Sequence, residues 1–564
     1  MAHRSVPWSL AALVVVNGSG WFFQGTEDAG WNSGLYPGSP TGVAASAGDG
    51  NASVTWTAPS NSGSSPITSY IVTASDGCAV QGAMTVFGSP PPTNVLFTGL
   101  NNGVAHTFTV TAVNSYGSGP PSLTSNFVTP SGTVPSWVSA CSSQQYVLAH
   151  SDGVTWMPID ASRLAVSLTT GAAAAWAVMT ANVDLWTLNA GYNQDVGISV
   201  DGTLVGWKES GGFAGTFSPN AATLQVVIPL AASTIYTAML QWKTNRPDPG
   251  SIYAGAGPIA GAYSPTRLTV QLIPTASARV FSVSSTQQYR LAGSDGATWK
   301  QVDGTNLSLS FAPPTGRWDA VITGNADLWT ADAGYNQDLG IEFGSGLDTW
   351  KESGGFAGTY SPNAAFVEDR QDVLSGTTYT VTLLWKANRF DSGSIYAGAG
   401  PVGARFSPTT LTVVLVPSVP GVAVGGTTLQ YRLDNSDGST WQVMDAVQLQ
   451  LSFNGAGSYQ IGALADLWTS VATYNQDLGI MVSGGAYGAG TLVAWKESGG
   501  FAGTFSPNAV FVTTDLHLDS GVTYTVWVVW KTNRRPDTSS VIWAGAGPVA
   551  THFSPSWVTA LQLS

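Results

Sequence analysis

The chain has 564 residues, which is more than one hydrophobic core usually serves, so we expect several domains. Only 9% of the residues are charged and the net charge is −13, which excludes the basic surfaces that nucleic-acid binding requires. Hydrophobic residues make up 43% of the chain, which excludes a disordered composition.

Residues 1–36 are rich in tryptophan and glycine and have no counterpart elsewhere in the chain. A short apolar stretch, Trp8 to Val16, has the length of a signal-peptide core, but no small-x-small cleavage site follows it. It is too short to cross a bilayer, and no other segment is apolar enough to do so. We expect an N-terminal arm that docks onto other virion or cell-surface proteins, with an atypical signal peptide as the alternative.

Residues 37–131 show short strands separated by turn clusters, which is typical of a β-sandwich. Trp56 in SVTWTAPS, the run from Pro66 to Tyr70 and the segment HTFTVTAVNSYGSG that begins at His106 carry a resemblance to the fibronectin type III family. The resemblance implies a β-sandwich with Trp56 in its core, on the second strand. His106 stands where that family usually has its corner tyrosine, so the hydrogen bond that this tyrosine makes must be replaced by a different interaction. The family's RGD tripeptide is absent, so integrin-type binding is not carried over.

The rest of the chain contains three copies of one long module. WKESGGFAGT begins at Trp207, Trp350 and Trp495, which lie 350 − 207 = 143 and 495 − 350 = 145 residues apart. Each copy also repeats DLWT, YNQD, SPNA, WK-x-NR and AGAGP in the same order. A period of this length is that of a domain rather than of a solenoid repeat. We place the modules at residues 132–275, 276–418 and 419–564, with prolines near the junctions.

The modules are expected to be all-β. The second copy shows the two-residue period of a strand: threonines at 378, 380 and 382 alternate with Tyr379, Val381, Leu383 and Trp385. Many short strands and Gly-rich turns over about 140 residues favour a jelly-roll-like sandwich. We expect the three sandwiches to form a linear string. The alternative is a compact pseudo-threefold assembly with AGAGP buried between modules.

The WKESGGFAGT motif allows two interpretations. It can be a structural corner, in which the lysine and glutamate pair and the glycines permit a sharp turn; the repeat favours this interpretation. It can instead be a loop that binds surface polysaccharide weakly, with a tryptophan platform and neighbouring polar groups. The candidate ligand-binding residues are then Trp207, Lys208, Asn193, Trp350, Lys351, Asn336, Trp495, Lys496 and Asn475.

No catalytic site is expected. Asp184, Asp195 and Glu209 raise the question of glycoside hydrolysis, but their repetition would require three active sites in one chain. YNQD lacks the alternating ligands of a calcium loop, none of the five histidines recurs in all three copies, and no cofactor motif occurs. We therefore expect a protein that is not an enzyme and has no metal or cofactor.

The two cysteines, Cys78 and Cys141, are expected to be unpaired, since position 141 aligns with Ser284 in the next copy. Their number excludes the disulfide-dense secreted class.

The order of domains resembles that of tail-associated or fibre proteins of phages that infect Gram-positive bacteria. The resemblance implies a non-catalytic structural protein on the virion surface that attaches to a host polysaccharide or glycoprotein. A secreted bacterial adhesin or carbohydrate-binding protein, outside the cell or on its surface, is the alternative. Accessory modules of a glycan hydrolase come third.

Overall fold

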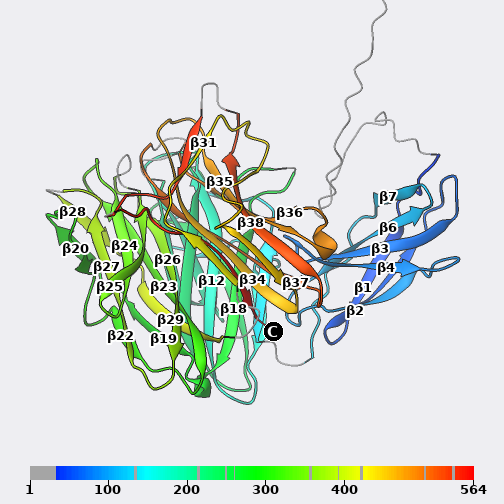
Figure 1. Cartoon of the computed structure of the whole chain (residues 1–564), viewed down its shortest axis with the longest axis horizontal. Helices are drawn as coiled ribbons and strands as arrows, with labels where there is room; N and C mark the ends of the chain where they lie inside the picture. Colours follow the sequence, from blue (N-terminus) through cyan, green and yellow to red (C-terminus); the bar gives the residue numbers. More distant parts are fainter. Residues whose placement is uncertain are drawn as a thin grey trace, which may run out of the picture.

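A computed structural model describes residues 34–132, 136–212, 216–247, 250–259, 261–354, 359–390, 393–418, 423–500, 504–535, 540–549 and 551–563. The predictions for residues 1–33, including the arm and the signal peptide, lie outside the described residues. Strands dominate the described part of the chain, and every ladder between them is antiparallel (Figure 1). The predicted all-β class is confirmed.

The first domain contains two sheets, ordered β1-β2-β5 and β4-β3-β6-β7. Trp56 is buried between them and meets Tyr70 edge-on, with 5.2 Å between ring centroids. His106 is also fully buried, and its backbone pairs with Val128. The strands are β1 (Thr41–Ala47), β2 (Asn51–Thr57), β3 (Ile67–Ser75), β4 (Val80–Phe87), β5 (Asn94–Thr98), β6 (Thr107–Asn114) and β7 (Gly117–Pro121).

The first module is a jelly roll. Its main strands follow the orders β8-β18-β12-β15 and β11-β16-β13-β14, which is the wrapping of eight strands into two facing sheets. Three short strands, β9, β10 and β17, extend these sheets. The strands are β8 (Trp137–Ser142), β9 (Tyr146–Ala149), β10 (Met157–Pro158), β11 (Ala165–Thr169), β12 (Ala175–Thr187), β13 (Gln194–Val200), β14 (Thr203–Ser210), β15 (Asn220–Leu230), β16 (Ile235–Thr244), β17 (Ser251–Ala254) and β18 (Thr266–Pro274).

The second module repeats this wrapping as β19-β29-β23-β26 and β22-β27-β24-β25. A short 3-10 helix, η1 (Thr275–Ser277), precedes it. Its strands are β19 (Val280–Ser285), β20 (Tyr289–Ala292), β21 (Lys300–Gln301), β22 (Ser308–Phe311), β23 (Arg317–Thr330), β24 (Gln337–Phe343), β25 (Gly346–Ser353), β26 (Asn363–Leu374), β27 (Tyr379–Ala387), β28 (Ser394–Ala397) and β29 (Thr409–Pro417).

The third module has the orders β30-β40-β34-β37 and β33-β38-β35-β36, with the 3-10 helix η2 (Gly485–Tyr487) as an addition. Each described sheet contains strands of one module only. The strands are β30 (Ala423–Thr427), β31 (Tyr431–Asp434), β32 (Gln442–Val443), β33 (Gln450–Asn454), β34 (Gly457–Thr469), β35 (Gln476–Ser483), β36 (Thr491–Ser498), β37 (Asn508–Leu518), β38 (Thr523–Thr532), β39 (Val541–Ala544) and β40 (Ser556–Gln562).

The modules form a closed ring, so the expected linear string is wrong. The equivalent strands β15, β26 and β37 contact one another in every combination, and the three modules lie side by side in Figure 1. An apolar cluster joins residues of all three modules, including Val178, Val414 and Leu561. Head-to-tail contacts between like units close into a ring when the rotation between them allows it, and here the units belong to one chain.

A disulfide joins the first domain to this ring, so the prediction of unpaired thiols is wrong. Cys78, in the turn between β3 and β4, bonds to Cys141 on β8, with 5.8 Å between their Cα atoms. Comparison of the copies could not reveal the pair, because the position aligned with Cys141 in the second module does not meet the first domain.

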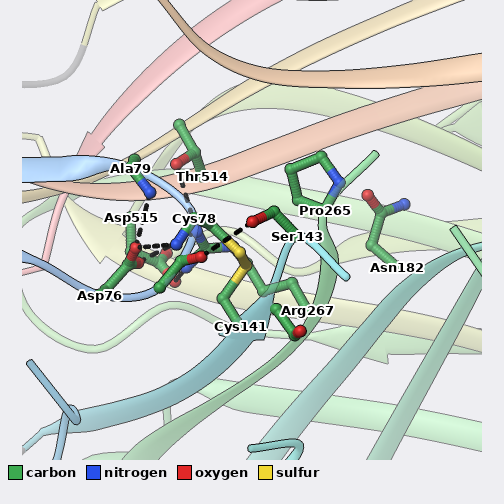
Figure 2. The surroundings of a disulfide bond; sticks show 12 residues. Asp76, Cys78, Ala79, Cys141, Ser143, Asn182, Pro265, Arg267, Thr514 and Asp515 are labelled. Carbon is green, nitrogen blue, oxygen red and sulfur yellow. Dashed lines mark hydrogen bonds and ion pairs between the residues drawn. A yellow bond between two sulfur atoms is a disulfide. The ribbon is translucent and has the colours of Figure 1, made fainter. Parts of the chain in front are cut away.

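A buried ion cluster lies beside the disulfide (Figure 2). The guanidinium of Arg267 lies 3.1 Å from an Asp76 carboxylate oxygen and 3.0 Å from one of Asp515. It therefore joins the first domain, the first module and the third. Arg267 aligns with Thr410 and Trp557 in the other copies, so the equivalent positions there cannot form this cluster.

Candidate functional site

The tryptophans of WKESGGFAGT are buried at the junctions between modules. Trp207, Trp350 and Trp495 are 4%, 4% and 5% exposed. Each lies on the edge strand of its sheet, and the next module covers that edge. The ring of Trp207 lies so close to Gly400 that a Cβ there would come within 2.7 Å of it, which explains why AGAGP needs glycine. The hypothesis of an exposed tryptophan platform is therefore wrong. The compact assembly, given as the alternative, buries the first three residues of each AGAGP segment, whereas the glycine and proline that follow are exposed.

The lysines that follow these tryptophans bind main-chain oxygens of the next module. Lys208 donates to the carbonyl oxygens of Asn325, at 3.2 Å, and of Pro408. Lys496 donates to those of Asn182, at 3.1 Å, and of Pro265, which closes the ring from the third module to the first. Burial lowers the pKa of both ammonium groups to about 8. Lys351 likewise donates to the carbonyl oxygen of Pro555.

The asparagines of YNQD also bridge the modules. Nδ2 of Asn475 donates to Oε1 of Glu497 at 2.6 Å and to the carbonyl oxygen of Phe217 in the first module at 3.0 Å. Asn193 and Asn336 make the equivalent pairs of bonds at the other two junctions. We call the three glutamates that accept these bonds the junction glutamates: Glu209, Glu352 and Glu497. Burial raises the pKa of each junction glutamate to about 8.

An ion pair lies beside each junction glutamate. In the third module, Asp477 faces Glu497 on one neighbouring strand and Lys531 on the other. Lys531 Nζ lies 2.5 Å from Asp477 Oδ2 and 5.0 Å from the centre of the Trp441 ring. No donor among the described residues reaches Oδ1 of Asp477, nor Oδ1 of its equivalents Asp195 and Asp338. Burial raises the pKa of Asp477 to about 6.

Three aromatic side chains form a second layer at each junction, and sequence reasoning missed them. Trp186 stacks on Tyr253, with 4.2 Å between ring centroids, and Phe217 lies 6.4 Å away. The other modules repeat this aromatic cluster with Trp329, Tyr396 and Tyr360, and with Trp468, Trp543 and Phe505. The sequence contained a sign of these clusters, since every copy has the tryptophan of DLWT and an aromatic residue directly before SPNA.

The outermost ring of each cluster is held in a strained backbone. Phe217, Tyr360 and Phe505 have φ of 55°, 55° and 56°, in the left-handed region that bulky residues rarely adopt. They are nevertheless 46%, 49% and 46% exposed. Strain of this kind concentrates at sites whose surroundings fix it. Here it holds three aromatic rings at the molecular surface.

A cleft of about 330 Å³ lies between the third module and the first. The first module contributes Trp186, Phe217 and the segment Ala256–Ile259 to its wall. The third module contributes Asn475, Asp477, Glu497, Asn533 and Arg534. The cleft is therefore lined by aromatic side chains of the first module and by carboxyl and amide groups of the third.

Among the described residues, no group of three or more His, Cys, Asp or Glu side chains could hold a metal ion. In the same part of the chain, no helix has the length and apolar character that crossing a membrane requires.

The two sheets of the first domain and its buried Trp56 agree with a match to a family model over residues 38–128. This segment is a fibronectin type III domain. The predicted resemblance is thereby confirmed. No curated protein matches the chain.

Solved structures match part of the chain. "Titin kinase and its flanking domains" is 27% identical, over 17% of each chain, with a TM-score of 0.15. The FN5 domain of Drosophila Lar is 21% identical over 17% of this chain and 98% of its own, with a TM-score of 0.14. The chicken CNTN1 FN1-FN3 domains are 14% identical over 43% of this chain and 69% of theirs, with a TM-score of 0.15.

Proposed function

We propose that the chain is a non-catalytic attachment protein on the surface of a virion or a bacterial cell, and that it binds host-surface polysaccharide through the aromatic clusters at its module junctions. The observation that carries the proposal is the repeated, strained and exposed aromatic side chain at each cluster: Phe217, Tyr360 and Phe505. Exposed rings offer an apolar face to sugar C–H groups. Three weak sites on one rigid ring gain by effective concentration on a repetitive polymer.

The buried carboxylates support a structural role rather than hydrolysis. Asp184 Oδ2 accepts from the backbone N–H of Glu497 at 3.0 Å, and Asp327 and Asp466 do the same at the other junctions. Asn475 and Asn533 both donate to Oε1 of Glu497, which holds this carboxyl group in place. These groups are engaged in holding the modules together.

Co-sedimentation with purified Gram-positive cell-wall polysaccharide tests the proposal. The triple variant Phe217→Gly, Tyr360→Gly and Phe505→Gly removes the exposed rings and suits the left-handed backbone, so it should fold and lose binding. A matched variant with tyrosine at positions 217 and 505, as the second module has naturally, should retain binding. Equal binding by the glycine variant would refute the proposal.

The disulfide favours a second candidate, a secreted adhesin. A bond between Cys78 and Cys141 persists in oxidising surroundings outside the cytoplasm. Thiol labelling of the unfolded protein, taken from its native source without reductant, distinguishes the candidates. Two unreactive cysteines support secretion, whereas two labelled cysteines support assembly in a reducing cytoplasm.

A further inference from the structure

Each module buries a lysine and an aspartate against each other within one of its sheets. In the first module, Asp195 on β13 lies opposite Lys243 on β16, and Nζ of the lysine is 2.5 Å from Oδ2 of the aspartate. Lys243 is 2% exposed and Asp195 is 0% exposed. The other modules repeat this buried pair, so it belongs to the module rather than to one accident of packing: Lys386 with Asp338, and Lys531 with Asp477.

A buried ion pair alone explains these contacts poorly. Removing two charges from water carries a large penalty, which their attraction offsets only when further hydrogen bonds satisfy the remaining polar atoms. Within the part of the chain that the structure describes, nothing donates to Oδ1 of Asp195 or of its two equivalents. Transfer of one proton across the contact gives an uncharged amine beside an uncharged acid, and burial favours this neutral pair. An amine and a carboxylic acid are the two groups that condense to an amide.

The amine is placed to attack the carboxyl carbon. This carbon lies about 1.2 Å from its oxygens, so Nζ of Lys243 is close to the range of roughly 3–3.5 Å from which reacting groups attack. The centre of the Trp156 ring lies 5.2 Å from the same Nζ and helps to keep water away, and Trp299 and Trp441 take this place in the other modules. Well-oriented groups react with effective molarities of about 10⁵–10⁸ M, and exclusion of water disfavours the reverse hydrolysis.

The junction glutamate is positioned to move a proton during this reaction. Glu209 on β14 lies opposite Asp195 on the side away from Lys243, so the three side chains form a row across neighbouring strands. Opposite residues have Cβ atoms about 4.5–5.5 Å apart, which brings the two carboxyl groups within reach of each other. Asn193 and Asn245 donate to Oε1 of Glu209 at 2.6 and 3.2 Å and fix its orientation. Burial, followed by the charge of Asp195, raises the pKa of Glu209 to about 8, so it holds a proton at neutral pH.

We propose that each module forms an isopeptide bond between its buried lysine and aspartate: Lys243 with Asp195, Lys386 with Asp338, and Lys531 with Asp477. The neutral Nζ attacks Cγ, the Nζ–Cγ bond forms and one Cγ–O bond breaks. The oxygen leaves as water with one proton from the carboxyl group and one from the amine, and the junction glutamate passes the amine proton to it. The reaction needs no oxidant or other reactant, and it does not depend on the proposed attachment function.

The bond would link two paired strands of one sheet covalently. It closes loops of 48, 48 and 54 residues in the three modules, which restricts the unfolded chain. Unlike the disulfide between Cys78 and Cys141, an amide persists in the presence of reductants. The three modules would therefore keep these cross-links both inside and outside the cell.

Intact-mass spectrometry of the full chain, unfolded and reduced, tests the bonds. Each bond removes one water, so after correction for the observed N-terminus the natural chain should be lighter than its sequence by about 18 Da per bond, about 54 Da in total. Protease digestion should also give branched peptides in which the segment around Asp195 is joined to the segment around Lys243. A mass equal to that of the sequence would overturn the proposal.

Two single variants tie the lost water to the site. Lys243→Arg keeps the positive charge beside Asp195, but its guanidinium stays protonated and cannot attack, so this protein should lack two waters rather than three. A deficit of three waters in this variant would place the dehydration elsewhere and refute the bond. Glu209→Gln should likewise lack only two waters, with the circular dichroism of the natural chain. Three missing waters in Glu209→Gln would refute the proton transfer through the glutamate.

Discussion

Replacement of Trp350 by alanine should destabilise the protein strongly. The side chain is 4% exposed, contacts Gly547 of the third module and lies 6.3 Å from the Trp299 ring, between centroids. A tryptophan buries up to about 250 Å², which at about 25 cal/mol per Å² gives roughly 6 kcal/mol as an upper bound. Measured Trp-to-Ala changes in cores cost about 3–5 kcal/mol, and we expect a value in that range.

Thermal and denaturant unfolding, followed by circular dichroism, measures this loss. For a unit of module size, about 3–5 kcal/mol corresponds to a melting temperature lower by roughly 10 °C. Phe390→Ala is the matched control, because Phe390 belongs to the same module and is 73% exposed; its melting temperature should change little. A Trp350→Ala protein that melts within about 1 °C of the natural chain would refute the burial of this residue at the junction.

The remaining predictions concern pH, docking and shape. Since burial raises the pKa of the junction glutamates from 4.5 to about 8, the folded state holds more protons than the unfolded state between these values. The melting temperature should therefore fall as pH rises from 5 to 8, and glutamine at all three positions should flatten this dependence. Arg267→Met leaves two buried carboxylates without their cation, so the stability of the docked fibronectin type III domain should fall by about 3–5 kcal/mol. A protease should then cleave this domain faster than in the natural chain, and an unchanged cleavage rate would contradict the ion cluster. Replacing Cys78 and Cys141 by serine removes a disulfide that closes a loop of 63 residues. The free energy of unfolding of that domain, measured with denaturant, should fall by about 4 kcal/mol. Small-angle scattering should give a radius of gyration of about 25 Å, whereas a linear string would give a much larger value.

The fold could be predicted from the sequence where local pattern decides it. The alternation around Trp385 places this residue in a sandwich core, where it is 2% exposed, and the repeat period gives three units of equal length. The ring was predicted only as the alternative to a linear string, because motifs kept for folding within a module and motifs kept for contact between modules look alike. Lys208 and Lys496 resemble surface lysines in sequence, yet both are buried in the next module.

The candidate site was misplaced for the same reason. WKESGGFAGT is the longest shared motif and therefore drew attention to Trp207, which the AGAGP segment of the next module covers. The exposed aromatic is Phe217, which appears as tyrosine in the second module and lies in a backbone conformation that no local pattern predicts. Its neighbour Trp186 differs from a core tryptophan only by its place at the end of β12, beside a junction. Position in the assembly, rather than residue type, separates the two.

The closed ring has a consequence for synthesis of the chain. The main-chain oxygens of Asn182 and Pro265 accept from Lys496, which is 314 and 231 residues further along the sequence. At about 5–20 residues per second, the first module waits roughly 10–60 s after its own sequence is made before its last neighbour exists. During that interval the surface that will receive Lys496 and Trp495 is uncovered. A ribosome that stops before the third module would release a chain with two open junction faces, and such a product should aggregate or attract chaperones.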